Sequence, residues 1–240
     1  LHVRNHPGKG GQVVSMAVVV ATGIAADGTR EVLGLDVGDS EDETFWRAFL
    51  LSLKQRGLTG VQLVISDQHS GLVKALKRSF QGVAHQRCRV HFARNLLAHV
   101  PKTHADMVAA LFRTIFAQPD PEAVNAAWDE VRDQLTGSFP KVGPLMDDAK
   151  VEVLAFTAFP KAHWRKIWST NPLERVNKEI KRRSRVVGIF LCVPLAPGGF
   201  NRSAARLVEV PRMTRNLSVD PCDGPDPVRA SLLGTSRVAA

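Results

Sequence analysis

Cysteine, long apolar runs and, in the last fifty residues, lysine are scarce in this 240-residue sequence. Its three cysteines, Cys88, Cys192 and Cys222, are too few and too scattered for a disulfide framework or a four-thiolate zinc site. The longest apolar run, around residues 16–21, falls far short of the roughly 20 residues that a membrane-spanning helix needs. No basic-then-apolar leader opens the chain. We therefore expect a soluble protein of a reducing cytoplasm.

Acidic residues are outnumbered, since 23 aspartates and glutamates face 32 lysines and arginines and leave a formal net charge of +9. A polyanion is a natural partner for such a chain, because lysine and arginine that neutralise phosphates release condensed counterions. A solvated basic surface is the plainer interpretation and stays open at this point. Hydrophobic residues make up 44% of the chain, enough for the core of one large domain or two small ones.

The N-terminal part of the chain alternates between strand and helix patterns. Apolar runs bounded by turn residues predict strands over residues 12–24, 31–37, 61–65 and 83–90. Ser40 and Glu43 resemble a capping box that begins a helix ending at Gly57, and a second helix is expected over 72–80. The first two long strands should form a hairpin. This order predicts a mixed sheet with helices packed on it, an α/β fold.

The rest of the chain changes character twice. From residue 91 to about 158 the strand signal disappears and apolar residues recur at helical spacing, which predicts an all-helical insertion. A basic stretch follows, in which Asn171-Pro172-Leu173-Glu174 has the composition of a helix start. Beyond Phe190 prolines are frequent and neither the helical nor the strand period persists, so we expect a weakly ordered tail.

Asp67 stands directly after a short apolar strand, where open α/β sheets place reactive groups. Its carboxylate is therefore a candidate metal ligand. The alternative is an ordinary aspartate that caps the following helix. His69, two residues further, is a candidate contact for a phosphate or a metal-bound water, although an uninvolved loop histidine explains it as well.

Glu174 is the second candidate acid. Locally, Asn171 and Glu174 also fit a helix cap in which the glutamate bonds back to the helix start. What favours a site is the series of cations along the same helix, which could lie beside a phosphate backbone, whereas a solvated basic helix is the alternative. These cations are Arg175, Lys178, Lys181, Arg182, Arg183 and Arg185.

Cys88 and His91 are spaced as Cys-x-x-His at the junction of a strand and a helix. They offer two ligands that suit zinc, but a zinc site needs two more, and no second Cys/His pair with suitable spacing occurs. We therefore favour a structural role in which the two side chains contact each other or the core.

Three motifs in register resemble the Mutator-type (IS256-like) transposases of bacterial insertion sequences, over residues 1–190. The motifs are Ser66-Asp67-x-His69-x-Gly71-Leu72, then Gln86-Arg87-Cys88-x-x-His91-x-x-x-Asn95-Leu96, and finally the segment from His163-Trp164 through Asn171-Pro172-Leu173-Glu174-Arg175 to Ile189-Phe190. The resemblance implies an RNase H-like mixed sheet interrupted by the all-α-helical insertion. It also implies a DDE-type site, an Asp-Asp-Glu triad in which Asp67 is the second Asp and Glu174 the glutamate.

The resemblance further implies the chemistry and the partners. Two Mg²⁺ (or Mn²⁺) ions about 4 Å apart would support DNA cleavage and strand transfer. Asp67 and Glu174 would bind them, Cys88 and His91 would form the structural signature, and His69 and Asn171 are candidate auxiliary residues. The expected partners are insertion-sequence ends and target DNA, bound by a homo-oligomer at the bacterial nucleoid, with no membrane and no small-molecule substrate.

The expected domain organisation follows from the same resemblance. It consists of a first part of the catalytic domain over 1–91, the helical insertion over 92–158, a second catalytic part with the basic helix over 159–190, and a divergent tail over 191–240.

The sequence departs from the family pattern at both ends. The first Asp of the triad and the N-terminal DNA-binding region should precede Leu1, so we expect this chain to be an inactive, truncated copy. Asp36 and Asp39 do not lie on the opening strand and are expected to be non-catalytic. After Phe190 the family continues with Pro-Asn, whereas this chain continues with Leu191-Cys192, for which we hypothesise a frameshift. A hydrolytic RNase H-like nuclease and a non-catalytic DNA-binding remnant are the alternative functions.

Overall fold

The structure, a computed structural model, describes residues 17–25, 27–38, 42–187 and 229–236. The chain divides into two compact units. Unit 1 comprises Leu1–Val64, Gln68–Val83 and Asn171–Ala240, and unit 2 comprises Ile65–Asp67 and Ala84–Thr170. Strands and helices are mixed, so the predicted α/β class is confirmed. The domain boundaries expected from the family resemblance stay a prediction.

Strands β1 (Ala17–Ile24) and β2 (Arg30–Gly38) form the predicted hairpin, with antiparallel pairing. Between them the backbone turns at Gly28, whose φ of 83° is easily reached only by a residue without a side chain. β1 is part of the valine-rich run of the sequence. Six of its eight residues are aliphatic, and most of the strand is buried. The core of unit 1 is therefore built on β1.

Strand β5 (Arg229–Ser236) pairs antiparallel with β1. Sequence reasoning placed this segment in a weakly ordered tail, and for these eight residues that prediction is wrong. The segment has little apolar periodicity of its own, but backbone hydrogen bonds to β1 need no particular side chains. The remainder of 191–240, and with it the frameshift hypothesis, lies outside the described residues.

Strands β3 (Val61–Ser66) and β4 (Ala84–Arg87) complete the strand order β2-β1-β5-β3-β4. The last four residues of β3 are buried, as a short apolar strand requires. β4 is shorter than the predicted 83–90, because helix α3 (Arg89–Leu97) begins directly after Cys88. The strand-to-helix junction thus falls within the Cys-x-x-His motif.

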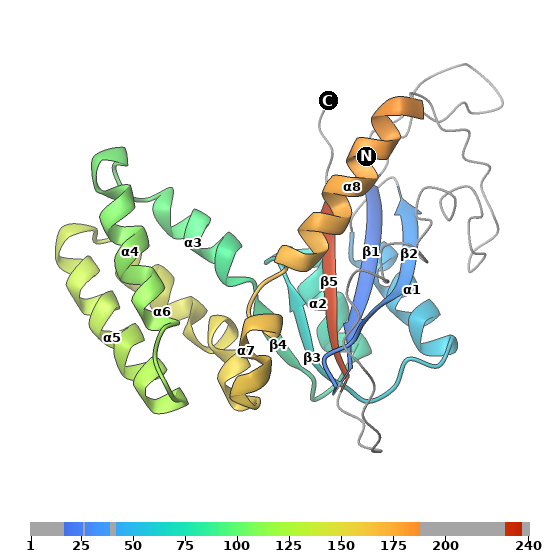
Figure 1. Ribbon diagram of the computed structural model, residues 1–240, viewed down its shortest axis with the longest axis horizontal. Coiled ribbons are helices and arrows are strands. Elements are labelled where there is room, and N and C mark those ends of the chain that lie inside the picture. Colours follow the sequence, from blue (N-terminus) through green and yellow to red (C-terminus); the bar gives the residue numbers. More distant parts are fainter. Residues whose placement is uncertain (1–16, 26, 39–41, 188–228, 237–240) are drawn as a thin grey trace. The chain divides into compact units, whose positions relative to one another are not determined.

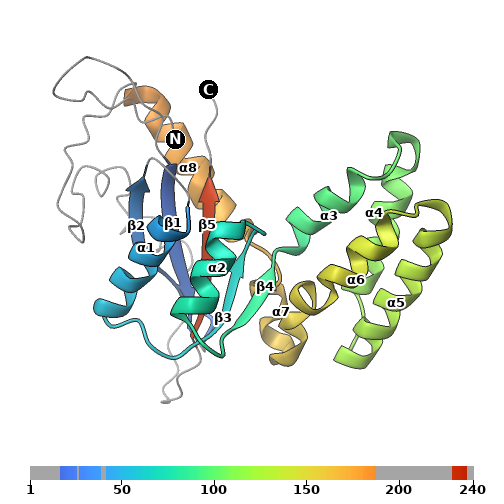
Figure 2. The ribbon, with the colours of Figure 1, turned by 180° about the vertical axis from the view of Figure 1, so that it is seen from behind.

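Helices α1 (Glu43–Gln55) and α2 (Ser70–Ser79) cover one face of the unit 1 strands, and α8 (Asn171–Val187) lies on the other (Figure 1, Figure 2). The apolar face of α1 follows the predicted helical spacing. It packs with residues of β1, β3 and α2 in one buried cluster that includes Val19, Trp46, Phe49, Leu50, Leu53, Val64, Leu72 and Leu76. Burial of each large side chain contributes roughly 1.5–3 kcal/mol.

Unit 2 is helical apart from β4 and the end of β3. After α3 it contains η1 (Lys102–His104), α4 (Ala105–Ile115), α5 (Pro121–Ser138), α6 (Val142–Val153), η2 (Ala155–Ala158) and α7 (Lys161–Ile167). No strand interrupts the described residues 92–158, in line with the predicted insertion. Aromatic rings form its core, with Phe92 stacked on Trp128 at a centroid separation of 5.7 Å and Phe112 edge-on to Trp128 at 6.0 Å.

Gln86 joins β4 to the helices of unit 2. Its buried side chain donates from Nε2 to the carbonyls of Arg87 and Val153, each at 2.7 Å, and its Oε1 accepts from the N–H of Phe156 at 2.7 Å. A buried amide satisfied in this way anchors its neighbours, because an unpaired partner would cost about 1–3 kcal/mol. The glutamine of the second motif is therefore structural.

Helix α1 is capped by Asp42 and not by Ser40. The Asp42 carboxylate accepts from the N–H of Phe45 at 2.8 Å. Glu43, the expected partner in a capping box, instead forms an ion pair with Arg78 at 2.6 Å. Ser40 lies outside the described residues. Aspartate offers the same kind of acceptor as serine. The spacing therefore predicts the helix correctly but does not distinguish Ser40 from Asp42 as its cap.

Substitution of the observed cap should measurably destabilise the chain. We expect Asp42→Ala to lower the free energy of unfolding by about 1 kcal/mol, because the N–H of Phe45 loses its acceptor. Urea denaturation of the purified protein measures this change. The matched control Ser40→Ala should change it by less than about 0.5 kcal/mol. Equal losses in the two variants would contradict the assignment of the cap.

Candidate functional site

Asp67 follows the last residue of β3 and belongs to unit 2. The preceding Ser66 is fully buried, and its hydroxyl lies 2.8 Å from Nε2 of His85, which fixes the end of the strand. The Asp67 side chain is 33% exposed. Asp67 does not cap α2, because the cap position is occupied by His69, which makes no capping hydrogen bond through its side chain. The strand therefore delivers a carboxylate to the surface.

Helix α3 brings two further side chains to Asp67. Cys88 is the cap residue of α3 and His91 lies in its first turn, so the three-residue spacing places them on one face of the helix. Nδ1 of His91 lies 2.8 Å from Oδ1 of Asp67, and a hydrogen bond joins His91 to the sulfur of Cys88. Asp67, Cys88 and His91 offer ligand atoms that all lie within 4.8 Å of one another. We call this group the Asp67–Cys88–His91 cluster.

The Cys88 thiol is buried and surrounded by donors. Both the backbone N–H and the hydroxyl of Thr170 donate to Sγ, each at 3.3 Å. Burial opposes ionisation of this thiol, but the hydrogen bonds from His91 and Thr170 outweigh it and lower the pKa of Cys88. The sulfur is therefore more easily ionised than that of an ordinary cysteine.

His91 carries the complementary charge. Its hydrogen bonds to Asp67 first and to Cys88 second raise the pKa of His91 to about 10, against the opposing effect of burial. At neutral pH the cluster is thus an imidazolium between a carboxylate and a sulfur. Nη1 of Arg94 lies 3.5 Å from Nε2 of His91, and because both groups are then cationic donors this contact adds no hydrogen bond to the cluster.

Arg89 and Trp168, which are close in the chain to Cys88 and Thr170, contact each other. The Arg89 guanidinium stacks over the Trp168 ring at 3.7 Å, and the N–H of Arg89 donates to the carbonyl of Trp168 at 3.1 Å. Burial lowers the pKa of Arg89 to about 10, so the side chain remains charged at neutral pH. Sequence reasoning missed this pair, because its members are far apart in the chain and neither belongs to a local pattern.

Glu174 lies in the first turn of α8, in unit 1. The helix begins at Asn171, within one residue of the predicted start. Because Asp67 and Glu174 belong to different units, their convergence on a common metal site stays a prediction. The auxiliary roles of His69, which is partly buried, and Asn171, which is exposed, also stay predictions.

The two faces of α8 differ in polarity. Leu173, Asn177 and Ile180 are buried, whereas Arg175, Lys178 and Arg182 are exposed. Each triplet follows helical spacing, so the helix has a buried side, apolar except for Asn177, and a basic side. Of these cations, Arg182 is engaged by both carboxylate oxygens of Glu179, at 2.9 and 2.6 Å. The side chains of Lys181, Arg183 and Arg185 lie outside the described residues.

Asp36 differs from Asp67 in its surroundings. It lies on β2, and its carboxylate accepts from the N–H of Val37 at 2.8 Å. Burial raises the pKa of Asp36, and the hydrogen bond from Val37 opposes this. Asp39 lies outside the described residues. The non-catalytic role expected for both aspartates stays a prediction.

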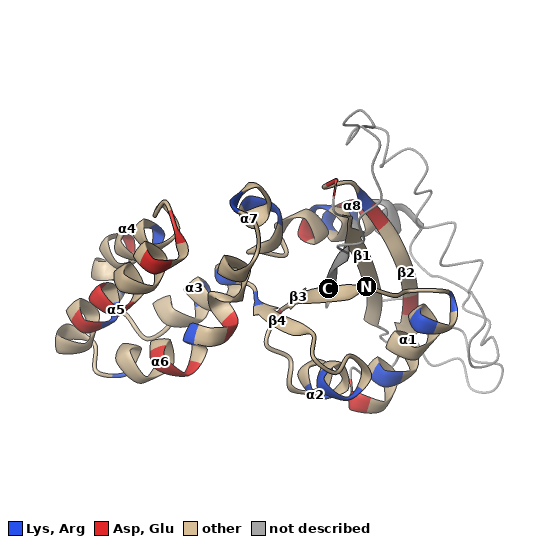
Figure 3. Ribbon diagram, turned by 90° about the horizontal axis from the view of Figure 1, so that it is seen from below, with Lys and Arg blue, Asp and Glu red and all other residues tan. Residues whose placement is uncertain are grey.

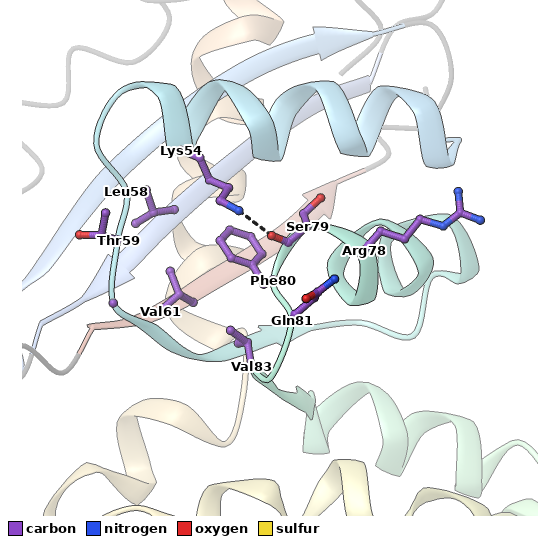
Figure 4. Close-up of a pocket in the computed structure, with 10 residues that line it drawn as sticks. Lys54, Leu58, Thr59, Val61, Arg78, Ser79, Phe80, Gln81 and Val83 are labelled. Atoms are coloured by element: carbon purple, nitrogen blue, oxygen red, sulfur yellow. Dashed lines mark hydrogen bonds between the residues drawn. The ribbon is translucent and has the colours of Figure 1, made fainter.

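A pocket of about 520 Å³ lies at the start of β3, the end of the strand opposite Asp67 (Figure 4). Lys54 lines it, but its Nζ donates to the carbonyl of Ser79 at 2.8 Å and lies 5.3 Å from the centre of the Phe80 ring. Arg78, the other cation of the lining, pairs with Glu43. Both cations already have protein partners, so this pocket is a weak candidate for an anion site.

A carboxylate at a strand end and a helix with a basic face suit an α/β protein that acts on phosphate esters. The family described as "Transposase, Mutator family" matches residues 1–197. The chain therefore belongs to the Mutator family of transposases. Among the described helices, none combines the length and the apolar character needed to cross a membrane.

Similar proteins include several transposases of bacterial insertion sequences. The transposase for insertion sequence element IS1081 of Mycobacterium tuberculosis is 49% identical over 180 residues, which cover 75% of this chain and 43% of the relative. The transposase for ISRM5 of Rhizobium meliloti is 38% identical over 180 residues, with coverages of 75% and 45%. The transposase for IS256 in transposon Tn4001 of Staphylococcus aureus is 37% identical over 183 residues, with coverages of 75% and 46%. The chain thus spans less than half the length of these relatives.

His91 should give the cluster a measurable pH dependence. The pKa of His91 is about 10 in the folded chain and about 6.5 in an unfolded chain, so folding favours the protonated imidazole. Its stabilising contribution is therefore complete below about pH 6.5 and is lost as the pH rises through about 10. We expect the free energy of unfolding of the Cys88→Ser variant, measured with urea in the presence of a chelator, to fall across this range.

The Cys88→Ser background is needed because the lowered pKa of the thiol acts with the opposite sign in the same range. Adding Asp67→Asn removes the largest cause of the raised pKa of His91, so the fall in stability should become much shallower. An equally steep fall in the Cys88→Ser variant with and without Asp67→Asn would contradict the ion pair.

Proposed function

We propose that this chain is catalytic-domain sequence of a DDE-type DNA transposase with an RNase H-like fold, which cleaves DNA strands and transfers them. Asp67 and Glu174 would be two of its three metal-binding carboxylates. The observation that carries the proposal is Asp67 itself, a surface carboxylate at the end of a buried strand in a chain of the Mutator family. A homo-oligomer on DNA and a location at the nucleoid follow from the family and stay predictions.

The donor atoms fit the metal that such chemistry uses. Carboxylate oxygens suit Mg²⁺ and Mn²⁺, which prefer hard oxygen ligands. A bound pair of these ions supplies charge stabilisation for the attacking and leaving oxygens at phosphorus. His91 holds Oδ1 of Asp67 at 2.8 Å and so orients the carboxylate, as hydrogen-bonded neighbours commonly do for metal ligands.

The basic side of α8 is the proposed DNA-binding surface. Arg175 and Lys178 are exposed there. Arg30 adds to this charge: burial lowers its pKa first, and the nearby Arg175 lowers it further, so the two cations repel each other in the protein alone. A bound phosphate would relieve that repulsion. No sequence motif marks Arg30, because it lies on β2, far from α8 in the chain.

Helix α5 differs from the basic side of α8, because it carries both acidic and basic residues (Figure 3). Arg132 pairs with Asp147 of α6 at 2.7 Å, and Lys150 of α6 pairs with Asp129 at 2.7 Å. These charges neutralise one another within unit 2. Unit 2 charges paired in this way should therefore attract DNA less strongly than the basic side of α8 does.

A shared metal site can be tested on the purified chain by replacing Mg²⁺ with Fe²⁺ in the presence of ascorbate and peroxide, which cuts the backbone next to bound iron. We expect cuts near both Asp67 and Glu174 because both carboxylates would bind the same ions. Mg²⁺ in excess should suppress both cuts, and either Asp67→Asn or Glu174→Gln should weaken both. Mass spectrometry of the fragments locates the cuts.

The pattern of cuts separates the alternatives. Cuts confined to residues around 67, 88 and 91 would contradict a site shared with Glu174. No metal-dependent cut at either carboxylate, together with undiminished DNA binding, would favour the non-catalytic DNA-binding protein. Asp129→Asn is the matched control, since it removes a carboxylate that is already paired with Lys150.

DNA binding should depend on α8 in a salt-dependent way. We expect Arg175→Ala and Lys178→Ala each to reduce the slope of log affinity against log salt by about one unit, since each would remove one phosphate contact. Arg182→Ala should have a smaller effect because Glu179 competes for this guanidinium. Fluorescence anisotropy with a DNA duplex at several salt concentrations measures the slopes.

The charge-matched control is Lys150→Ala, which changes the net charge equally but removes a cation paired with Asp129. It should leave the slope unchanged. A reduction as large as that of Arg175→Ala would show that net charge alone, and not the basic side of α8, governs binding.

A further inference from the structure

The Asp67–Cys88–His91 cluster contains a combination of donors that a magnesium site does not require. Mg²⁺ prefers oxygen ligands, whereas imidazole and thiolate suit Zn²⁺ and related softer cations. We propose that Asp67, Cys88 and His91 form a binding site for one Zn²⁺ ion, with the carboxylate, the sulfur and the imidazole as three ligands and water as the fourth.

The geometry of the cluster is close to that of a zinc site. Zinc bonds of about 2.0–2.3 Å in tetrahedral arrangement place ligand atoms roughly 3.3–3.6 Å apart. The three ligand atoms lie within 4.8 Å of one another. The His91–Asp67 pair, now at 2.8 Å, would have to open by roughly half an ångström to admit the ion. Asp67 and His91 are each about one-third exposed, so their side chains have room for this shift.

The donors around the sulfur also suit a bound cation. Zinc binds a deprotonated sulfur and a neutral imidazole, so its binding would release to solvent the protons that these two ligands carry in the free protein. The two hydrogen bonds from Thr170 to Sγ already support a negative sulfur. Such donors around a ligand commonly orient it and tune the metal.

Access to the site comes from one side. Cys88 is fully buried, whereas Asp67 and His91 reach the surface, so an ion would enter past the carboxylate and the imidazole. A water molecule would supply the fourth ligand from the same side. Three protein ligands and one water are the arrangement of zinc sites that keep an open position. The third ligand is an aspartate that follows β3, so the spacing of cysteines and histidines alone does not reveal the site.

The inference does not require the proposed function, since zinc binding can be measured without DNA. If Asp67 also binds Mg²⁺ as proposed, zinc at the cluster would withdraw that carboxylate from the magnesium site. The two proposals can fail independently. The metal-dependent cut near Glu174 tests the shared magnesium site, whereas metal binding to the sulfur of Cys88 tests the zinc site.

Cadmium provides a direct test, because its bond to a thiolate produces an ultraviolet charge-transfer absorption. The protein for this test carries Cys192→Ser and Cys222→Ser, so that Cys88 is its sole thiol. We expect the absorption to saturate at one equivalent of Cd²⁺ and to be removed by competing Zn²⁺ but not by Mg²⁺. In the same background, Asp67→Asn and His91→Gln should each weaken Cd²⁺ binding at least about tenfold.

His99→Gln is the matched control, since it removes an exposed histidine just after α3 and should leave the affinity unchanged. Asp67→Asn alters a surface side chain, and urea denaturation verifies that the variants are folded. The proposal is overturned if folded protein shows no charge-transfer absorption. It is equally overturned if Asp67→Asn and His91→Gln bind Cd²⁺ as tightly as the parent protein.

Discussion

The ion pair between Asp67 and His91 is the contact on which the candidate site depends. It joins the end of β3 to the first turn of α3, and through His91 it reaches the sulfur of Cys88 and then Thr170. A carboxylate at a strand end would otherwise be free to turn in solvent. Here an imidazolium fixes its direction, so the orientation of Asp67 depends on the start of α3 and, through Cys88, on Thr170.

Local patterns predicted much of the fold. The helical spacing of Trp46, Phe49, Leu50 and Leu53 located α1, and the apolar run before Asp67 located β3, because one buried face or a fully buried strand leaves a periodic signature in the residues themselves. β5 left no such signature, since its pairing with β1 rests on backbone hydrogen bonds. The choice of Ser40 over Asp42 failed for a related reason, because both residues offer the acceptor that a helix start needs.

The residues of the candidate site likewise fall into those that the sequence predicted and those that only the structure shows. Asp67, Cys88, His91 and Glu174 were predicted because they lie in motifs that resemble a family to which the chain belongs, and the structure brings the first three together. Neither Thr170 as the donor to Cys88 nor the stacking of Arg89 on Trp168 could be predicted, because each joins residues far apart in the chain and depends on how α3 packs within unit 2. The proposed contribution of Arg30 to DNA binding likewise could not be predicted, because it depends on the nearby Arg175 of α8.

Thr170 is the last residue of unit 2, and α8 begins with the next residue in the chain. Its two hydrogen bonds to Cys88 therefore hold the polypeptide at the point where it leaves one unit for the other. Glu174 stands less than one and a half helical turns beyond this anchor. A substitution that loosened Thr170 would accordingly release the residue from which α8 starts, even though every residue of the helix itself stayed the same.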